Sequence, residues 1–164
     1  MTERPPAAPS PTRSARLALA VGTLGGLGRV PIAPGTAASL AAVLVAAALP
    51  AGSYSVLVLA LFLVASAAAP VAARAMTAAT GDEDPRSFVL DEAAGVWLAA
   101  LRPAQPSWAA FVGIFVLFRV FDVWKPWPIR RFERIGRGWG VLLDDLAAGV
   151  ATAAVLFFLE ALLR

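Results

Sequence analysis

The sequence contains no cysteine and no histidine among its 164 residues. The absence of cysteine excludes disulfide bonds, thiolate zinc sites and cysteine nucleophiles. The absence of histidine removes the most common general base and the most common metal ligand. Any chemistry of this chain must therefore depend on Asp, Glu, Ser, Thr, Lys and Arg side chains, or on a metal ion that oxygen atoms bind.

Charged residues are also scarce. They make up 15% of the chain, whereas 59% of the residues are apolar and the mean hydropathy is +0.74. A soluble domain has roughly 25% charged and about 45–50% apolar residues, so we do not expect a water-soluble globule. The net charge of +3 is small for a protein that binds nucleic acid and ordinary for one that faces anionic lipid.

Five apolar segments predict an all-α fold, a polytopic membrane helix bundle. A membrane-spanning helix needs about 20 residues, and only the second and fifth segments reach that length. The other three either extend into flanking residues, enter the membrane without crossing it, or lie buried between the others. The segments are Ala37–Leu49, Tyr54–Ala73, Phe88–Leu101, Trp108–Phe121 and Val141–Leu163.

The chain divides into two regions of different composition. Residues 1–16 are rich in Pro, Ala, Ser and Arg and are expected to form a flexible arm, and residues 17–164 form the membrane-embedded domain. If the amino terminus is cytoplasmic and all five segments cross, only Arg102 and Arg164 of the 14 basic residues lie outside. This distribution follows the positive-inside rule and predicts that the polar clusters share the cytoplasmic face.

Acidic residues lie just inside three of the apolar segments. Asp91 and Glu92 begin the third, Asp144 and Asp145 begin the fifth, and Asp122 ends the fourth. A carboxylate in an apolar helix costs roughly 2.5–3.5 kcal/mol on insertion scales. Neighbouring helices could gather these side chains around a divalent cation, which prefers oxygen ligands. Alternatively, the carboxylates only form salt bridges with the interfacial basic residues Arg119, Lys125 and Arg137.

Glycine and proline mark two further features. Gly95 and Gly149 each follow an acidic pair by about one helical turn, and close helix packing is the simpler interpretation of both. The stretch Gly22–Gly28 contains too much glycine for a stable helix. Thr36 precedes an apolar run and is expected to be the N-cap of a helix. The free amide groups at the start of that helix, together with Ser39 one turn later, are expected to form an anion site. Capping alone is the alternative.

Basic residues surround the end of the fourth segment. Arg119 and Asp122 are three residues apart, so they are expected to pair on one helix face. Pro126 and Pro128 stop the helix, which leaves Lys125 on a stiff turn. The cations suit phosphate binding, and the alternative is an ordinary basic anchor with a tryptophan belt.

Four stretches carry a resemblance to a known family: Arg29–Thr36 with Ser39, Phe88–Gly95, Phe118–Ile129 and Gly138–Gly149. In this order and at these separations they resemble the phosphatidylglycerophosphatase A family. Each stretch is weak alone, but together they cover most of the chain between about Leu24 and Val150. Ala38 departs from the family pattern, in which we expect glycine.

The resemblance implies a Mg²⁺-dependent lipid phosphatase of the bacterial inner membrane. The distribution of basic residues predicts that its active site faces the cytoplasm. The enzyme would hydrolyse phosphatidylglycerophosphate to phosphatidylglycerol and phosphate in phospholipid synthesis. Its partners would be the membrane and an anionic phospholipid substrate, and no nucleic acid. The family is expected to require its acidic residues, here Asp91, Glu92, Asp122, Asp144 and Asp145.

These residues lead to a specific hypothesis for the site. The expected Mg²⁺ ligands are Asp91, Asp122 and Asp144, and Glu92 or Asp145 is the expected general base. The expected phosphate-binding residues are Thr36, Ser39, Arg119 and Lys125. Metal-assisted hydrolysis and a carboxylate nucleophile that forms a phosphoryl-enzyme fit the sequence equally well.

Other classes of membrane protein fit the sequence less well. A small transporter or channel would also place carboxylates at helix ends, but it would favour charges near the bilayer centre and repeated halves, and we find no internal repeat. A phosphatidyltransferase carries a run of spaced Asp residues with Gly-Ala-Arg, which is missing here. A non-catalytic scaffold would not need two acidic pairs in apolar helices, where carboxylates are costly.

Overall fold

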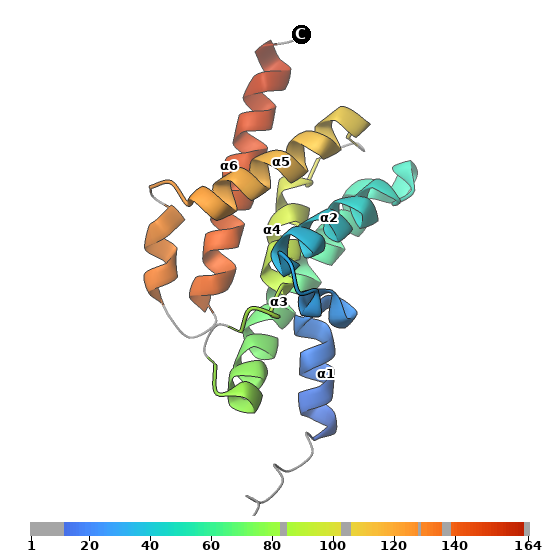
Figure 1. Ribbon diagram of the computed structural model, residues 1–164. Coiled ribbons are helices and arrows are strands. Elements are labelled where there is room, and N and C mark those ends of the chain that lie inside the picture. The colour runs from blue at the N-terminus through green and yellow to red at the C-terminus, as the bar shows by residue number, and fades with distance from the viewer. Residues whose placement is uncertain (1–11, 83–84, 103–105, 128, 136–138, 163–164) are drawn as a thin grey trace, which may run out of the picture.

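The computed structural model describes residues 12–82, 85–102, 106–127, 129–135 and 139–162 (Figure 1). Helices and their connections make up this part of the chain, without a strand, which confirms the predicted all-α fold. The α-helices are α1 (Arg13–Gly22), α2 (Pro34–Ala47), α3 (Tyr54–Thr80), α4 (Leu90–Ala99), α5 (Trp108–Trp124) and α6 (Trp139–Leu162). The 3-10 helices are η1 (Leu24–Arg29), η2 (Ala51–Ser53) and η3 (Ile129–Ile135).

Helices α2 to α6 correspond to the five predicted apolar segments. Two of them, α3 with 27 residues and α6 with 24, are long and apolar enough to cross a membrane. Helix α4 has only 10 residues. At 1.5 Å per residue it is about 15 Å long, half the thickness of a ~30 Å hydrocarbon core, so it does not span a membrane by itself.

Helix α4 lies inside the bundle, in contact with α2, α3 and α6 (Figure 1). Eight of its 10 residues are buried. The indole Nε1 of Trp97 donates a hydrogen bond to the carbonyl of Ala42 on α2 at 3.1 Å, and the hydroxyl of Tyr54 on α3 donates to the carbonyl of Ala100 at 2.9 Å. These bonds satisfy polar groups in the interior and fix α4 against its neighbours.

The outward surfaces of the longer helices are apolar. On α5, Val112, Val116 and Val120 are exposed at four-residue spacing and form one stripe along the helix. On α6, Phe157 and Phe158 are each about two thirds exposed, at 68% and 66%. Helices that are apolar on their exposed side as well as on their buried side suit a lipid environment.

Charged residues lie at the two ends of α6. Asp145 and Glu160 are 15 residues apart with no charged residue between them, which corresponds to about 22 Å along the helix. Glu160 pairs with Arg102, which follows α4, at 2.6 Å between Nη1 and Oε2. The helix thus joins two polar levels through an uncharged layer.

The amino-terminal part contains a helix that the sequence analysis did not predict. Helix α1 begins at Arg13, inside the segment 1–16 that we expected to be a flexible arm, and residues 1–11 lie outside the described residues. Within η1, Gly25 and Gly26 have φ angles of 69° and 108°. These left-handed conformations favour glycine, so the glycine-rich stretch interrupts the helix as expected.

The predicted N-cap of the next helix is wrong. Ala33 is the N-cap of α2, with φ 49° and ψ 60°, and Pro34 is the first helical residue. Proline suits this position because its φ is already close to the helical value and it lacks an N–H group that would need a partner. Thr36 therefore lies in the first turn of α2 and does not cap it.

Candidate active site

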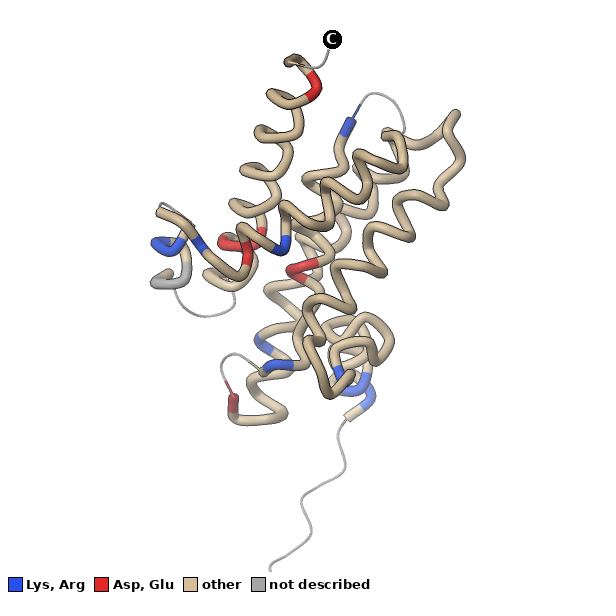
Figure 2. Tube along the Cα trace, turned by 45° about the horizontal axis from the view of Figure 1, so that its top comes forward, with Lys and Arg blue, Asp and Glu red and all other residues tan. Residues whose placement is uncertain are grey.

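Three acidic side chains from two helices meet in the interior of the bundle. Asp91 and Glu92 lie in the first turn of α4, and Asp145 lies in the second turn of α6. One carboxylate oxygen from each lies within 4.8 Å of the others. Figure 2 shows the acidic segments of α4, α5 and α6 gathered beside one another. We call Asp91, Glu92 and Asp145 the carboxylate cluster.

The crossing of α4 and α6 brings the cluster together. A Cβ atom on Gly149 would overlap the carbonyl oxygen of Gly95, and a Cβ atom on Gly95 would overlap the carbonyl oxygen of Asp145. Gly95 follows Asp91 by four residues, and Gly149 follows Asp145 by four. Residues four apart share a helix face, so both aspartates lie one turn from the crossing and face it. The predicted close packing at both glycines is confirmed.

The two aspartates of the cluster are buried, and Glu92 is half-buried. Asp91 is 2% exposed and Asp145 is 4% exposed. Burial raises the pKa of Asp91 well above its usual range, and the charges of Glu92 and Asp145 raise it further. Burial also raises the pKa of Glu92. Buried carboxylates at this separation repel one another unless protons or a cation compensate their charges.

The oxygens of the cluster suit a hard divalent cation. Oδ1 of Asp91 and Oε2 of Glu92 are buried and have no hydrogen-bond partner in the described part of the chain. In proteins, Mg²⁺ is usually bound by one or two carboxylates, with water and phosphate oxygens completing its shell. The residues present therefore fit the expected magnesium ion without the loss of an existing hydrogen bond at these two oxygens.

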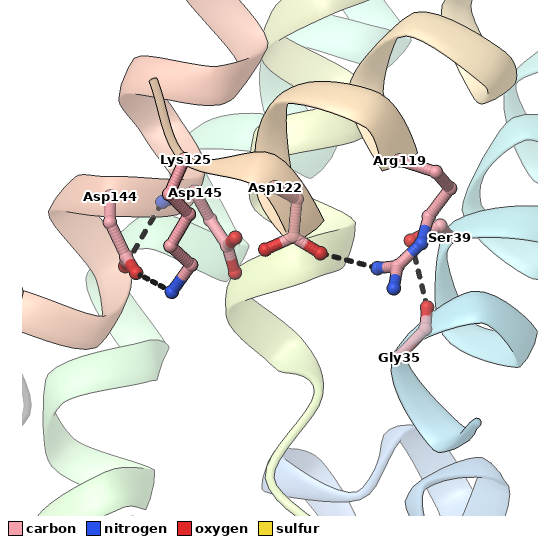
Figure 3. A network of polar contacts seen from close by, with 7 residues as sticks. All are labelled: Gly35, Ser39, Arg119, Asp122, Lys125, Asp144 and Asp145. Carbon is pink, nitrogen blue, oxygen red and sulfur yellow. Dashed lines mark hydrogen bonds and ion pairs between the residues drawn. The ribbon is translucent and has the colours of Figure 1, made fainter. Parts of the chain in front are cut away.

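Two further acidic residues lie beside the cluster and pair with cations. Asp144 accepts a hydrogen bond from Nζ of Lys125 at 2.6 Å (Figure 3). Asp122 pairs with Arg119, three residues earlier on α5, which confirms that predicted pair. Both pairs neutralise a partly or fully buried carboxylate with a side chain from α5 or its exit turn.

The grouping of carboxylates differs from the predicted metal ligands. Of those residues, Asp91 belongs to the cluster, whereas Asp122 and Asp144 are ion-paired. Glu92 and Asp145 take their places in the cluster. Adjacent residues of a helix point about 100° apart, so Asp145 faces α4 while Asp144 faces Lys125.

A cavity of about 700 Å³ lies beside the cluster. The segment from η1 into α2, the end of α3 and the residues before α4 form its walls, and Glu92, Arg119 and Arg86 line it. Two guanidinium groups thus line the same space as one carboxylate of the cluster and the carboxylate of Asp82. Guanidinium groups bind phosphate through paired, charge-assisted hydrogen bonds, so the cavity suits a phosphorylated group next to the cluster.

The four predicted phosphate-binding residues lie at different places. Arg119 lines the cavity, and Figure 3 shows Lys125 beside Asp144, with Asp145 and Asp122 between it and Arg119. Ser39 is fully buried, and its hydroxyl donates a hydrogen bond to the carbonyl of Gly35 at 2.8 Å. Thr36 is half-buried in the first turn of α2. The structure brings together Arg119 and the cluster, and it directs the Ser39 hydroxyl to the backbone.

Two residues of this site were not predicted from the sequence. A Cβ atom on Gly35 would overlap Oε1 of Glu92 and lie 3.4 Å from Nη1 of Arg119, so glycine leaves room for the carboxylate. Glycine is less favourable than most residues within a helix, so a glycine in the first turn indicates that another group approaches the backbone at this position. Nothing in the sequence distinguishes Arg86 from the other basic residues outside the apolar segments.

The fold and the site define an all-helical, largely apolar protein with buried carboxylates beside a cavity that arginine side chains line. A family model described as Phosphatidylglycerophosphatase A matches residues 20–160, and the chain belongs to this family. The resemblance that the four sequence stretches indicated is confirmed.

Three relatives match about half of the chain each. Phosphatidylglycerophosphatase A of Escherichia coli (strain K12) is 41% identical over 80 residues, 48% of this chain and 46% of that protein. The protein of the same name from Haemophilus influenzae is 38% identical over 85 residues, 51% of this chain and 52% of its own. A Bacteroides thetaiotaomicron protein with the provisional name phosphatidylinositol-3-phosphatase is 44% identical over 70 residues, 42% of this chain and 44% of its own. The chain spans about half the length of these curated relatives, and no solved structure matches it.

Proposed function

We propose that the protein is a Mg²⁺-dependent membrane phosphatase that hydrolyses phosphatidylglycerophosphate to phosphatidylglycerol and inorganic phosphate. The observation that carries this proposal is the carboxylate cluster next to a cavity lined by Arg119 and Arg86. The reaction and the substrate come from the family and from the names of two relatives. The product would enter phospholipid synthesis as the precursor of cardiolipin.

Each group of the site has a role that follows from its position. Asp91, Glu92 and Asp145 would hold the cation through their converging oxygens. Arg119, which Asp122 orients through its ion pair, would bind the terminal phosphate of the substrate in the cavity. When bound, a divalent cation neutralises phosphate charge and lowers the pKa of a water molecule that it binds.

The reaction breaks the bond between phosphorus and the headgroup oxygen. In one route, Glu92 or Asp145 accepts a proton from water through its carboxylate oxygen that does not hold the cation, as the water oxygen attacks phosphorus. The bond from phosphorus to the headgroup oxygen breaks, and the carboxylate passes the proton to that oxygen. In the other route, a carboxylate attacks phosphorus, and water later cleaves the acyl phosphate. Acid-quenched single-turnover reactions distinguish the routes, because only the second gives a phosphoryl-enzyme that can be trapped.

The proposal includes a location in the bacterial inner membrane, with the cluster on the cytoplasmic side. Support comes from the two long apolar helices and from the exposed apolar surfaces of α5 and α6. The positions of the basic residues add to it, since only Arg102 and Arg164 of 14 fall on the outer side if the predicted segments cross in turn. This count takes the third segment, whose helix α4 is too short to span a bilayer alone, to connect the level of the carboxylate cluster with that of Arg102.

The test uses the full chain, purified in detergent, with phosphatidylglycerophosphate as substrate. We expect phosphate release that requires Mg²⁺, stops with a chelator, and falls by roughly 100-fold or more in Asp91→Asn and Asp145→Asn. Glu160→Gln is the matched control, since it changes an acidic residue at the far end of α6, and it should keep its activity. No phosphate release by the wild type would contradict the function, and full activity of both Asn variants would contradict the site.

The substrate is tested with other lipid phosphates under the same conditions. Phosphatidic acid has a terminal phosphate directly on its glycerol backbone, and phosphatidylinositol 3-phosphate corresponds to the name of the third relative. We expect both to react more slowly than phosphatidylglycerophosphate. Equal rates would contradict the proposed headgroup preference while leaving the phosphatase activity in place.

A further inference from the structure

A second cavity, of about 620 Å³, lies where the chain leaves α5. It is lined by Trp124, Lys125, Pro126, Trp127, Arg130 and Arg131. We call this cavity the Trp–Arg groove. It shares no lining residue with the cavity beside the carboxylate cluster. Trp124 and Trp127 are exposed, at 76% and 74%. The proposed reaction assigns no role to either side chain.

Local backbone structure holds the groove in shape. Lys125 ends α5 in a left-handed conformation with φ 43°, and its amide donates to the carbonyl of Phe121 at 2.8 Å. Ile129, at the start of η3, is 4% exposed and packs into the core. The chain therefore turns between two anchored points, and Pro126 restricts the backbone between them.

The groove combines positive charge with large aromatic rings. The guanidinium carbon of Arg131 lies 5.4 Å from the centre of the Trp127 ring, a cation–π contact that orders both side chains. Lys125 forms a salt bridge with Asp144, and Arg130 and Arg131 add two exposed positive charges. Tryptophan favours the boundary between hydrocarbon and headgroups, and guanidinium groups bind phosphate.

We propose that the Trp–Arg groove binds an anionic phospholipid at a second site, apart from the carboxylate cluster. The lipid phosphate lies against Arg130 and Arg131, and its glycerol and acyl chains lie along Trp124 and Trp127. The positive charge of the groove favours an anionic headgroup over a zwitterionic one. This inference depends on contact with a membrane and not on the reaction that the cluster catalyses.

Native mass spectrometry of the full chain in neutral detergent tests the binding. The probes are short-chain phosphatidylserine, which is anionic and has no terminal phosphate to release, and short-chain phosphatidylcholine, which is zwitterionic. Arg130→Gln/Arg131→Gln removes two charges from the groove, and Arg13→Gln/Arg16→Gln removes two from α1 as a matched control.

We expect the wild type and the α1 control to retain phosphatidylserine with the same affinity. Phosphatidylcholine should bind the wild type about tenfold more weakly, and the groove variant should bind phosphatidylserine about tenfold more weakly. Equal phosphatidylserine binding by the two double variants would overturn the proposal. Equal binding of the two lipids by the wild type would also overturn it, because that result indicates only general contact with the membrane surface.

A brominated phosphatidylserine tests the location of the bound lipid through quenching of tryptophan fluorescence. Trp124→Phe/Trp127→Phe should lose most of the quenching. Trp108→Phe removes a tryptophan that is 70% exposed at the other end of α5, and this control should keep the quenching. Quenching that persists in the double variant would overturn the assignment of the lipid to the groove.

Discussion

At the scale of residues, the acidic side chains of the site have two different kinds of surroundings. Asp144 and Asp122 are neutralised by Lys125 and Arg119. The carboxylate cluster instead keeps buried oxygens without a hydrogen-bond partner in the described residues. A buried carboxylate is costly to keep ionised without compensation, so the cluster requires protons or a cation. We therefore propose the metal site at the cluster, with Asp144 and Asp122 in ion pairs beside it.

Gly35→Ala is expected to lower activity without lowering stability. Alanine is favoured over glycine within a helix by roughly 0.5–1 kcal/mol, but the new methyl group would overlap the carboxylate of Glu92 and displace it. We expect about a tenfold loss of phosphate release and a higher Mg²⁺ concentration for half activation. Gly52→Ala, where the added Cβ meets open space, is the control. An unchanged Mg²⁺ dependence in Gly35→Ala would count against the role of Glu92.

Lys125→Met is expected to destabilise the protein because it leaves Asp144 without its cation. The Asp144 side chain is 5% exposed, whereas that of Lys125 is 27% exposed, so solvent reduces the effect to about 1–3 kcal/mol. Lys125→Met/Asp144→Asn should recover part of this loss. Denaturant unfolding of the two single variants and the double variant measures the coupling, and purely additive effects would show that the pair contributes nothing.

At the scale of elements, the crossing of α4 and α6 sets the distance between Asp91 and Asp145. Helix α4 is short and buried, and hydrogen bonds to Ala42 and from Tyr54 fix it between α2 and α3. Helix α6 meets it at Gly149. Because the contact is between backbones, any side chain added there must separate the two helices and the carboxylates with them.

Gly95→Ala is therefore expected to reduce both stability and activity. Its methyl group would overlap the backbone carbonyl of Asp145, and overpacking of this kind costs about 1–3 kcal/mol. Gly113→Ala on α5 is the matched control, because its methyl group meets only Cδ2 of the flexible side chain of Leu156. Thermal unfolding and phosphate release are measured for both variants. Equal effects would show that the crossing does not control the site.

The bounds of helices α2 to α6 could be predicted from the sequence to within three residues, except for the end of α3, which lies seven residues further on, and helix α1 was not predicted. The segments expected at 54–73 and 108–121 are helices Tyr54–Thr80 and Trp108–Trp124, since long apolar runs between proline and glycine residues define such helices. The member of each acidic pair that faces the cluster could not be predicted. That choice depends on the rotation of α4 against α6, which the contact between the two helices fixes only in the folded protein.

At the scale of the whole molecule, an uncharged apolar layer separates two polar levels. One level contains the carboxylate cluster, and the other contains the Arg102–Glu160 pair. The exposed sides of α5 and α6 are apolar through this layer. The composition of the sequence indicated such a layer, but short segments such as the third could not be assigned from length alone, because burial of α4 between other helices is a property of the tertiary structure.

Val64→Arg tests the contact of this layer with lipid. Val64 is 68% exposed within the uncharged part of α3. On a surface that faces water, this change would alter stability by about 0.5 kcal/mol or less, whereas in a bilayer an arginine costs roughly 2.5–3.5 kcal/mol. We expect much less folded protein in the membrane fraction than for Ile32→Arg, which changes a residue that is 82% exposed before α2. Equal amounts of the two variants would contradict the membrane location.

The binding of Mn²⁺, a paramagnetic substitute for Mg²⁺, tests the carboxylate cluster most directly. Electron paramagnetic resonance of free Mn²⁺ gives the affinity of the full chain in detergent without reference to any substrate. We predict saturable binding by the wild type and by Glu160→Gln, and binding about tenfold weaker or more in Asp91→Asn and Asp145→Asn. A wild-type protein that binds no Mn²⁺, or an Asp145→Asn variant that binds it as tightly as the wild type, would contradict a metal site formed by Asp91, Glu92 and Asp145.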